Sequence, residues 1–241
     1  MQRRYRIGTR GSKLALVQAN EVARRIALAA HAPVDEVAEI VVISTQGDRV
    51  QDRALSEIGG KGLFTQEIEE QLLDARIDVA VHSMKDMPTQ LPDGLTIDCL
   101  LEREDPRDAF ISLKAPALAA LPSGSKVGTS SLRRAAQLKA KRPDLEVVPF
   151  RGNVDTRLQK LADGVADATF LAVAGLNRMG LSARITAPIA PEDMLPAVAQ
   201  GAIGIERREG DDEAFHLLQK IHHAETGLRV AAERALLEEE W

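Results

Sequence analysis

The chain has 241 residues, of which 44% are hydrophobic and 28% are charged, and this composition is typical of a soluble globular protein with one large or two medium domains. Its 31 Lys and Arg residues are outnumbered by 36 Asp and Glu residues, so the net charge of −5 argues against nucleic acid or anionic membranes as general partners. The single cysteine, Cys99, excludes an intrachain disulfide and a cysteine-rich metal site.

The basic start of the chain lacks the pattern of a signal peptide. Met1-Gln-Arg-Arg-Tyr-Arg6 is followed by Ile7-Gly-Thr-Arg-Gly-Ser12, where a signal peptide needs an apolar core. No stretch of the sequence approaches the roughly 20 apolar residues of a membrane span. We therefore expect a cytoplasmic protein.

Strand and helix patterns alternate along the chain, as in α/β proteins. In the first part they predict strands over residues 5–8, 39–45, 77–81 and 96–101, a helix capped by Ser12 and a helix over residues 63–75. In the second part they predict strands over residues 109–113 and 145–150, a strand that begins at Lys126, and helices that begin after residues 129–131 and at residue 156.

Polar residues follow the apolar strand predicted over residues 77–81. His82, Ser83, Lys85 and Asp86 come directly after it, and Pro88 closes the segment. Open α/β sheets bind ligands at the carboxyl ends of their strands, so Lys85 and Asp86 are the first candidates for a site. The alternative is a solvated Lys-Asp pair in an ordinary loop, which is common and contributes little.

Two other residues have competing interpretations. Lys61 stands in the glycine-rich run Ile58-Gly-Gly-Lys-Gly62, which is either a mobile loop that covers an anion or an ordinary exposed loop. Cys99 lies within a predicted strand with no neighbouring His or Lys in the sequence, and we interpret it as a small core residue rather than a nucleophile.

Arginines recur where predicted strands turn into helices. Cations in the first turn of a helix face the positive end of its dipole, which is unfavourable unless an anion is bound there. One such arginine is more simply a surface ion-pair partner, but several gathered at strand ends indicate a pocket for a ligand with several acidic groups. We expect this pocket in a cleft between two related lobes. The arginines are Arg10, Arg133, Arg134, Arg151, Arg157 and Arg178.

The chain resembles the porphobilinogen deaminase (hydroxymethylbilane synthase) family over about residues 5–207. The matching segments occur in the family's order, which makes chance agreement very improbable. They are Ile7-Gly-Thr-Arg10 with Ser12 and Leu14-Ala-Leu16, Gly60-Lys-Gly-Leu-Phe64, Ala80-Val-His-Ser-Met-Lys-Asp86, Gly128-Thr-Ser-Ser-Leu-Arg-Arg134, Arg151-Gly-Asn-Val-Asp-Thr-Arg157, Leu171-Ala-Val-Ala-Gly-Leu176 with Arg178, and Leu195-Pro-Ala197 with Gln200-Gly201.

The resemblance implies an enzyme of tetrapyrrole biosynthesis, the route to haem and chlorophyll. Members of the family join four porphobilinogen units, with loss of ammonia each time, on a dipyrromethane primer that is covalently bound to the protein. Asp86 would be the catalytic acid or base that stabilises the cation formed as the amine leaves. A monomer that uses neither nucleic acid nor membrane is also implied.

The resemblance assigns further roles residue by residue. The primer would be bound by Ser83, Lys85, Asp86, Thr129, Ser131, Arg133, Arg134 and Arg157. The substrate and the growing chain would be bound by Arg10, Ser12, Lys61, Arg151, Arg157 and Arg178, with Lys61 on a loop over the site.

The fold implied by the resemblance is α/β, with two lobes like those of type II periplasmic binding proteins, mixed sheets and an interlobe cleft. Domain 1 would comprise residues 1–98 and 196–219, and domain 2 residues 99–195. Residues 220–241 would be the helical start of a small third α/β domain that is largely absent. One departure from the family is Ala199, where a glycine is common. The alanine is expected to stiffen the segment through which the chain crosses from domain 2 back to domain 1.

The family's primer-bearing cysteine has no counterpart in this sequence, because the chain ends at Leu237-Glu-Glu-Glu-Trp241 without a Gly-Gly-Cys segment. We therefore expect no covalent attachment and no turnover by the family's route, whether the chain is a truncated product, a shortened form or a divergent one. The alternative function is a two-lobed binding module for a small polyanion. Nucleic-acid binding is disfavoured by an aromatic content of 3%, and His222-His223 is expected on a helix surface rather than in a metal site.

Overall fold

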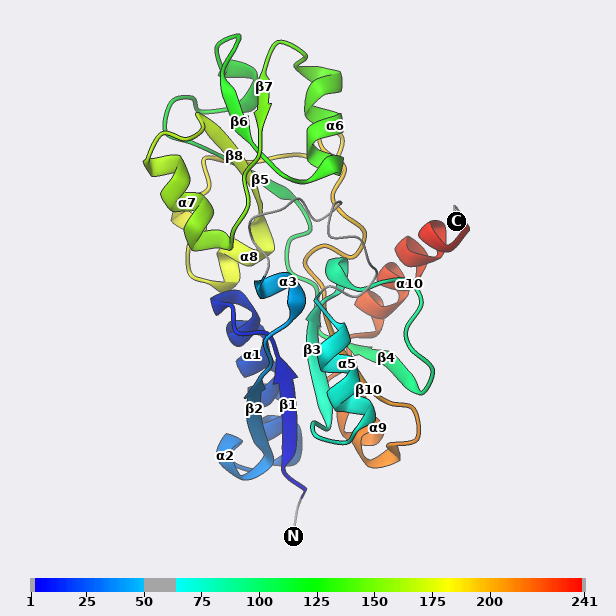
Figure 1. The fold of residues 1–241 in the computed structure, drawn as a ribbon. Coiled ribbons are helices and arrows are strands. Elements are labelled where there is room, and N and C mark those ends of the chain that lie inside the picture. Colours follow the sequence, from blue (N-terminus) through cyan, green and yellow to red (C-terminus); the bar gives the residue numbers. More distant parts are fainter. Residues whose placement is uncertain (1–2, 50–63, 240–241) are drawn as a thin grey trace. The chain divides into compact units, whose positions relative to one another are not determined.

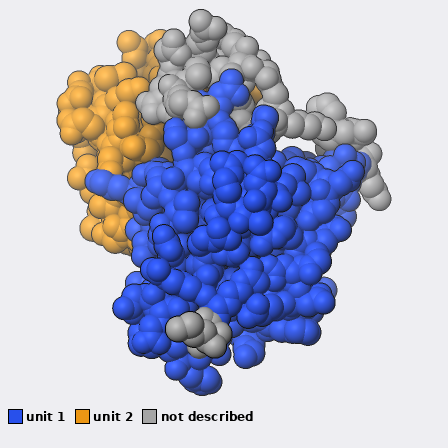
Figure 2. All heavy atoms as spheres, turned by 60° about the horizontal axis from the view of Figure 1, so that its bottom comes forward, with its two compact units in different colours: residues 1–104, 202–241 blue, residues 105–201 orange. Residues whose placement is uncertain are grey.

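The computed structural model describes residues 3–49 and 64–239, which form two compact units, each with a five-stranded mixed sheet. Unit 1 comprises residues 1–104 and 202–241, and unit 2 comprises residues 105–201 (Figure 2). The predicted α/β class with two mixed sheets is therefore confirmed. The predicted domain boundaries lie a few residues before the points at which the chain passes between the units, after residues 104 and 201. Residues 220–241 group with unit 1, so a separate third domain stays a prediction.

The sheet of unit 1 has the strand order β2-β1-β3-β10-β4 (Figure 1). Strands β1, β2 and β3 are parallel, and β10 is antiparallel to both of its neighbours. The elements of unit 1 are β1 (Tyr5–Thr9), α1 (Lys13–Ala30), α2 (Val34–Val37), β2 (Ala38–Val42), α3 (Gln46–Arg49), α5 (Gln66–Leu73), β3 (Val79–Ser83), the 3-10 turn η1 (Met84–Asp86), β4 (Leu95–Leu100), β10 (Ile203–Arg208), α9 (Asp212–Gln219) and α10 (Ala224–Glu239).

The sheet of unit 2 has the order β7-β6-β8-β5-β9, with the same succession of strand directions as unit 1. Its elements are β5 (Asp108–Ser112), η2 (Leu118–Ala120), β6 (Lys126–Gly128), α6 (Leu132–Lys141), β7 (Glu146–Val148), α7 (Val154–Ala162), β8 (Ala168–Ala172), α8 (Val173–Arg178), η3 (Ser182–Arg184) and β9 (Ala187–Pro188). Strand β6 therefore takes the place in unit 2 that β1 takes in unit 1, and both strands end in a similar sequence, Ile7-Gly-Thr9 in β1 and Val127-Gly-Thr129 at the end of β6.

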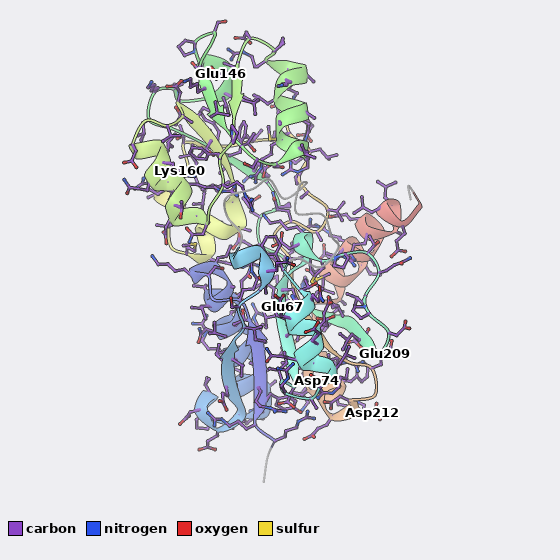
Figure 3. The ribbon with its side chains drawn as sticks, viewed as in Figure 1. Glu67, Asp74, Glu146, Lys160, Glu209 and Asp212 are labelled. Carbon is purple, nitrogen blue, oxygen red and sulfur yellow. The ribbon has the colours of Figure 1, made fainter. Side chains whose placement is uncertain are left out.

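Helices cover both faces of the unit 1 sheet because side chains alternate along its central strands. Val79 and Val81 of β3 pack into the core that contains α1, whereas Ala80 packs with Ile68 and Leu72 of α5 on the opposite face. Figure 3 labels Glu67 in the first turn of α5 and Asp74 just beyond its last residue. The two layers leave β3 buried along most of its length, which fixes the position of the residues at its end.

Helix α1 shows how the sequence sets the start and end of an element. The Ser12 side chain accepts a hydrogen bond from the Ala15 N–H, as predicted for an N-cap. The helix ends at His31, whose left-handed backbone lets its N–H reach the carbonyls of the last turn. Between these ends, Val22 and Ile26 recur at helical spacing on the buried face.

The strand predicted over residues 77–81 is displaced toward its polar end. The observed β3 begins at Val79 and continues through His82 and Ser83, because β10 pairs with it there: Ile203 faces Ser83, and Gly204 faces His82. Strand β10 comes from a distant part of the chain, so a local pattern could not reveal this extension. The strand predicted over residues 39–45 is shorter and ends at Val42.

Asp78 anchors the amino end of the unit 1 sheet. Its carboxylate accepts hydrogen bonds from the backbone N–H and the guanidinium of Arg6, at 2.8 to 3.0 Å, and from Arg3 at 3.0 Å. Burial alone would raise the pKa of Asp78, but the Arg6 and Arg3 donors outweigh it and hold the pKa well below its usual range. Asp78 is therefore ionised in the folded protein at neutral pH.

The substitution Asp78→Asn is expected to lower the free energy of unfolding by about 3 kcal/mol, because Arg6 loses its buried carboxylate, while Arg3 keeps Asp211 as a partner. Since the pKa of Asp78 is depressed in the folded state, its contribution is present above the ordinary aspartate pKa and is lost as the pH falls below it. Urea unfolding at several pH values measures both effects. Asp74→Asn, at an exposed ion pair, is the control and should change stability by less than about 0.5 kcal/mol.

Ala199 occupies a backbone conformation that favours glycine. Its φ is 58°, and the residue is fully buried. For an L-residue with a Cβ the left-handed region costs about 1–2 kcal/mol, because the Cβ approaches the following carbonyl oxygen. Ala199, which was expected to stiffen the segment that leads back to unit 1, therefore also introduces backbone strain.

The substitution Ala199→Gly is expected to raise the free energy of unfolding by about 0.5 kcal/mol, since relief of strain exceeds the added freedom of the unfolded chain. Ala140→Gly is the matched control. It lies on the exposed side of α6, where glycine should instead destabilise by about 1 kcal/mol. Equal losses of stability in the two variants would show that Ala199 is not strained.

Candidate functional site

The predicted binding residues follow the carboxyl ends of parallel strands in each unit. In unit 1, Arg10 follows β1, and Lys85 and Asp86 follow β3. In unit 2, Thr129 follows β6, and Arg151 follows β7. Parallel strands end at the same edge of a sheet, which is where open α/β sheets bind ligands.

The turn that carries Asp86 is fixed by backbone bonds and a buried methionine. The Met84 N–H donates to the Ala202 carbonyl at 3.0 Å, and the Met87 N–H donates to the Met84 carbonyl at 3.2 Å. Met84 and Met87 are buried, whereas Lys85 and Asp86 between them are exposed. The turn therefore presents one cationic and one anionic side chain to solvent at the end of β3.

Other predicted residues of unit 1 have identifiable partners. Ser83 and the Gln18 side chain exchange hydrogen bonds at 3.0 and 3.1 Å. The Arg10 guanidinium lies 4.2 Å from the centre of the Phe64 ring. Ser12 is the N-cap of α1. Lys61 lies outside the described residues, so its predicted place over the site stays a prediction.

A buried carboxylate joins the two arginines at the start of α6. Asp108, which is fully buried, is 2.7 Å from the Arg134 guanidinium and 2.8 Å from that of Arg133, and it also accepts a hydrogen bond from Gln200 at 3.0 Å. Burial alone raises the pKa of Asp108, but Arg134 and Arg133 outweigh it and lower the pKa to about 2. Two cations share one anion, so this group retains a positive charge.

Two guanidinium nitrogens of unit 2 are buried without a hydrogen-bond partner among the described residues. They are the Nε of Arg134 and one Nη of Arg151. The remaining Arg134 nitrogens donate to Asp108 and to the Phe170 carbonyl. A buried donor without an acceptor is costly, so these two positions suit the oxygen atoms of an anion.

Backbone carbonyls hold several of the other predicted arginines. Arg133 donates to the Leu195 carbonyl at 2.5 Å, Arg157 to that of Gly152 at 2.9 Å, and Arg178 to that of Gly201 at 2.8 Å. Carbonyls orient a guanidinium without cancelling its charge. The carbonyl of Arg151 itself accepts a hydrogen bond from Lys160 of α7 at 3.0 Å. Figure 3 labels Lys160.

The hydroxyl groups predicted to bind the primer also shape the turn before α6. The Ser131 Oγ accepts a hydrogen bond from the Arg134 N–H at 3.4 Å, and the Thr129 Oγ1 accepts one from the Ser131 N–H at 3.2 Å. As a result, the helix begins where both arginines fall in its first turn, as predicted.

The sequence reasoning missed a buried polar cluster beneath the Asp86 turn. The His82 Nε2 lies 2.8 Å from a Glu206 carboxylate oxygen, and both side chains are buried on the α5 face of the sheet. Burial raises the pKa of the nearby Glu69, and the Glu206 charge raises it further, against the Thr65 hydroxyl and His82. Register across β3 and β10 brings His82 and Glu206 together, so no short motif could have signalled the pair.

Cys99 is fully buried in β4, and burial raises the pKa of its thiol to about 12, so its predicted role as a core residue is confirmed.

His222 and His223 were expected on a helix, and this was wrong: they lie between α9 and α10. His222 Nδ1 accepts the Leu100 N–H at 3.1 Å, and the His223 N–H donates to the Leu100 carbonyl at 2.8 Å. No cluster of metal ligands occurs among the described residues.

The family model described as "Porphobilinogen deaminase, dipyromethane cofactor binding domain" matches residues 5–216. The chain is 60% identical over 236 residues to porphobilinogen deaminase of Paracoccus denitrificans, with 98% of this chain and 75% of that protein covered. The chain belongs to the porphobilinogen deaminase family. It is also 54% identical to the chloroplastic porphobilinogen deaminase of Oryza sativa subsp. japonica, with 96% of this chain and 65% of that protein covered. It thus spans three quarters of one relative and about two thirds of the other.

Solved structures support the predicted type II binding-protein fold. A periplasmic substrate-binding protein of a Coxiella burnetii ABC transporter has a TM-score of 0.54 at 17% identity, covering 95% of this chain and 96% of that one. A nutrient-binding protein of Burkholderia cenocepacia has a TM-score of 0.52 at 12% identity, with 95% and 93% covered. At these identities the likeness concerns the fold. In the described part of the chain, no helix has the length and apolar character needed to cross a membrane.

The family's dipyrromethane group fits the donors of unit 2. Dipyrromethane carries carboxylate side arms, and the unpartnered nitrogens of Arg134 and Arg151 are the type of donor that a buried carboxylate requires. The net positive charge of the group formed by Arg133, Arg134 and Asp108 favours the same ligand. The residues that the structure describes are therefore compatible with the group that the family binds.

The substitution Asp108→Asn is expected to lower the free energy of unfolding by about 3 kcal/mol, because Arg133 and Arg134 lose their common anion. Since the pKa of Asp108 is lowered from 3.8 to about 2, its stabilising effect is complete well above pH 4 and is lost as the pH falls toward 2. Urea unfolding at pH 7 and at acid pH measures this. Asp193→Asn, at an exposed ion pair with Lys141, is the control and should have little effect at either pH.

Proposed function

We propose that this chain carries the substrate-binding and catalytic residues of a hydroxymethylbilane synthase, which condenses four porphobilinogen molecules and releases ammonia at each step. Two findings support the proposal. The first is membership of the family, and the second is the presence of an exposed Asp86 on a fixed turn of unit 1 and of arginines with unsatisfied donors in unit 2. The observation that carries it is the buried, unpartnered nitrogen on each of Arg134 and Arg151.

The arginines bind the acetate and propionate side arms of the pyrroles. Arg133, Arg134 and Arg157, together with Lys85 and the hydroxyls of Ser83, Thr129 and Ser131, hold the primer, whereas Arg10, Ser12, Arg151, Arg157, Arg178 and Lys61 hold the substrate and the growing chain. Guanidinium groups suit this task because they pair with carboxylates through two parallel hydrogen bonds. The carbonyls of Gly152 and Gly201 set the direction of the Arg157 and Arg178 guanidinium groups.

Asp86 is the catalytic residue of the proposal. Porphobilinogen loses its amino group as ammonia, and a positive charge develops on the pyrrole and its methylene carbon. A carboxylate held nearby stabilises that charge, and it can transfer the protons that the departing amine gains and that the attacked pyrrole carbon loses. When bound, the dipyrromethane group supplies the pyrrole carbon at which the first new bond forms.

The relatives do not support the expectation that the chain is inactive, and they do not favour the binding module. Both are named as deaminases, and the similarity of the solved binding proteins concerns the fold. A cytoplasmic, monomeric protein remains part of the proposal, although the rice relative is chloroplastic. The binding module is therefore an outcome that the experiment must distinguish from turnover.

The test measures porphobilinogen binding by calorimetry and its consumption by the chain supplied with free hydroxymethylbilane. Asp86→Asn is expected to slow consumption by about 10²–10⁴-fold with little change in binding, because the carboxylate acts on the developing charge. Arg151→Met is expected to weaken binding by about tenfold or more, since a charge-assisted hydrogen bond is lost. The controls are Asp93→Asn and Arg184→Met, at exposed positions of the same residue types.

Saturable binding by the unmodified chain without any consumption would support the polyanion-binding module instead. Consumption that survives in Asp86→Asn at the original rate would remove Asp86 from the chemistry. If binding is the same in Arg151→Met and Arg184→Met, the unpartnered nitrogen of Arg151 does not face the ligand.

A further inference from the structure

Helix α10 binds the segment that follows Asp86. Arg234 donates hydrogen bonds to three successive carbonyls, those of Met87 at 3.3 Å, Pro88 at 2.5 Å and Thr89 at 3.2 Å. Residues 87–89 belong to no strand or helix, and Pro88 has no N–H to donate. An arginine thus replaces the ladder of hydrogen bonds that a strand would otherwise provide.

The same helix binds the other end of β4 and the residues beyond it. Glu233 accepts two hydrogen bonds from the Arg103 guanidinium, at 2.5 and 3.0 Å, in the parallel arrangement that carboxylates and guanidinium groups favour. The Thr226 hydroxyl accepts the Arg103 N–H at 3.0 Å. Arg103 stands just before the chain leaves unit 1 at residue 104.

Adjacent residues of α10 therefore hold two separate segments of the chain. Val230, 2% exposed, fixes the helix against unit 1, and Arg234 contributes to the wall of a groove of about 480 Å³ that Met84 and Thr89 also line. Burial lowers the pKa of Arg234, while the Glu238 charge raises it. The guanidinium is thus half-buried against the neutral carbonyls that it binds.

The Asp86 turn is consequently held on both sides. Upstream, β3 pairs with β1 and β10, and Met84 packs over Gly204, where any larger residue would collide with the methionine sulfur. Downstream, Met87 is buried and its N–H donates to the Met84 carbonyl, and Arg234 binds the carbonyls of residues 87–89. Removing Arg234 leaves these carbonyls without the guanidinium that ties them to α10.

We infer that Arg234 is a positioning residue for Asp86, and that α10 couples the Asp86 turn to the crossing segment at Arg103 through the neighbouring Arg234 and Glu233. The inference rests on the proposed function only for what Asp86 does; the mechanical contact exists independently of it. Arg234 itself binds no substrate in this scheme.

Hydrogen–deuterium exchange of the whole chain tests the contact without reference to activity. In Arg234→Met, which keeps an unbranched apolar stem but removes the guanidinium and its donors, exchange at residues 84–91 is expected to be at least tenfold faster, with β1 and α1 unchanged. Arg234→Lys should show an intermediate effect, because one ammonium cannot reach three carbonyls in the way a guanidinium can. The control is Arg229→Met, an exposed residue on the same helix that pairs only with Glu225 among the described residues.

Kinetics provide the second measurement. Arg234→Met is expected to lower kcat for porphobilinogen at least tenfold with little change in KM, and Arg234→Lys should restore part of it. Unchanged exchange at residues 84–91 in Arg234→Met would overturn the inference, as would an equal increase throughout unit 1, which would indicate general destabilisation. If the unmodified chain shows no turnover, the proposed function fails, while the exchange result still decides whether Arg234 holds the turn.

Discussion

The pairing of Asp108 with Arg133 and Arg134 explains the charge arrangement of unit 2. Arginines in the first turn of a helix meet the positive end of its dipole, so they require an anion. The protein supplies one buried carboxylate for two guanidinium groups, which is enough to hold them and too little to neutralise them. The remaining positive charge, and the nitrogens of Arg134 and Arg151 that have no partner among the described residues, are the basis for the proposed binding of a polyanionic ligand at this edge of the sheet.

The two sheets show how one arrangement of strands serves different tasks. Each has three parallel strands followed by an antiparallel one, and in each a serine caps the helix after the first parallel strand: Ser12 for α1 and Ser131 for α6. Unit 1 uses the end of its third parallel strand to present Asp86, whereas unit 2 uses the ends of the first two to present arginines. The same edge thus carries the proposed acid–base group in unit 1 and proposed anion-binding arginines in unit 2.

Several features of the fold and of the candidate site could be predicted from the sequence, because they depend on residues that are close together in the chain. The cap at Ser12, the arginines in the first turn of α6, the burial of Cys99 and the polar segment after β3 each depend on neighbouring residues. The contacts that were missed join distant segments: Asp108 with Arg134, His82 with Glu206, and Arg234 with residues 87–89. The placement of His222 and His223 failed for the same reason, because their pairing with Leu100 of β4 competes with helix formation.

The discontinuous build of unit 1 has a consequence for how the protein is made. Strand β10 lies between β3 and β4, yet it leaves the ribosome only after the whole of unit 2. The early part of unit 1 must therefore wait with β3 unpaired on one side while residues 105–201 are translated and can fold by themselves. An exposed strand edge is prone to pair with other chains, so the open edge of β3 exposes the nascent chain to aggregation until β10 has been made.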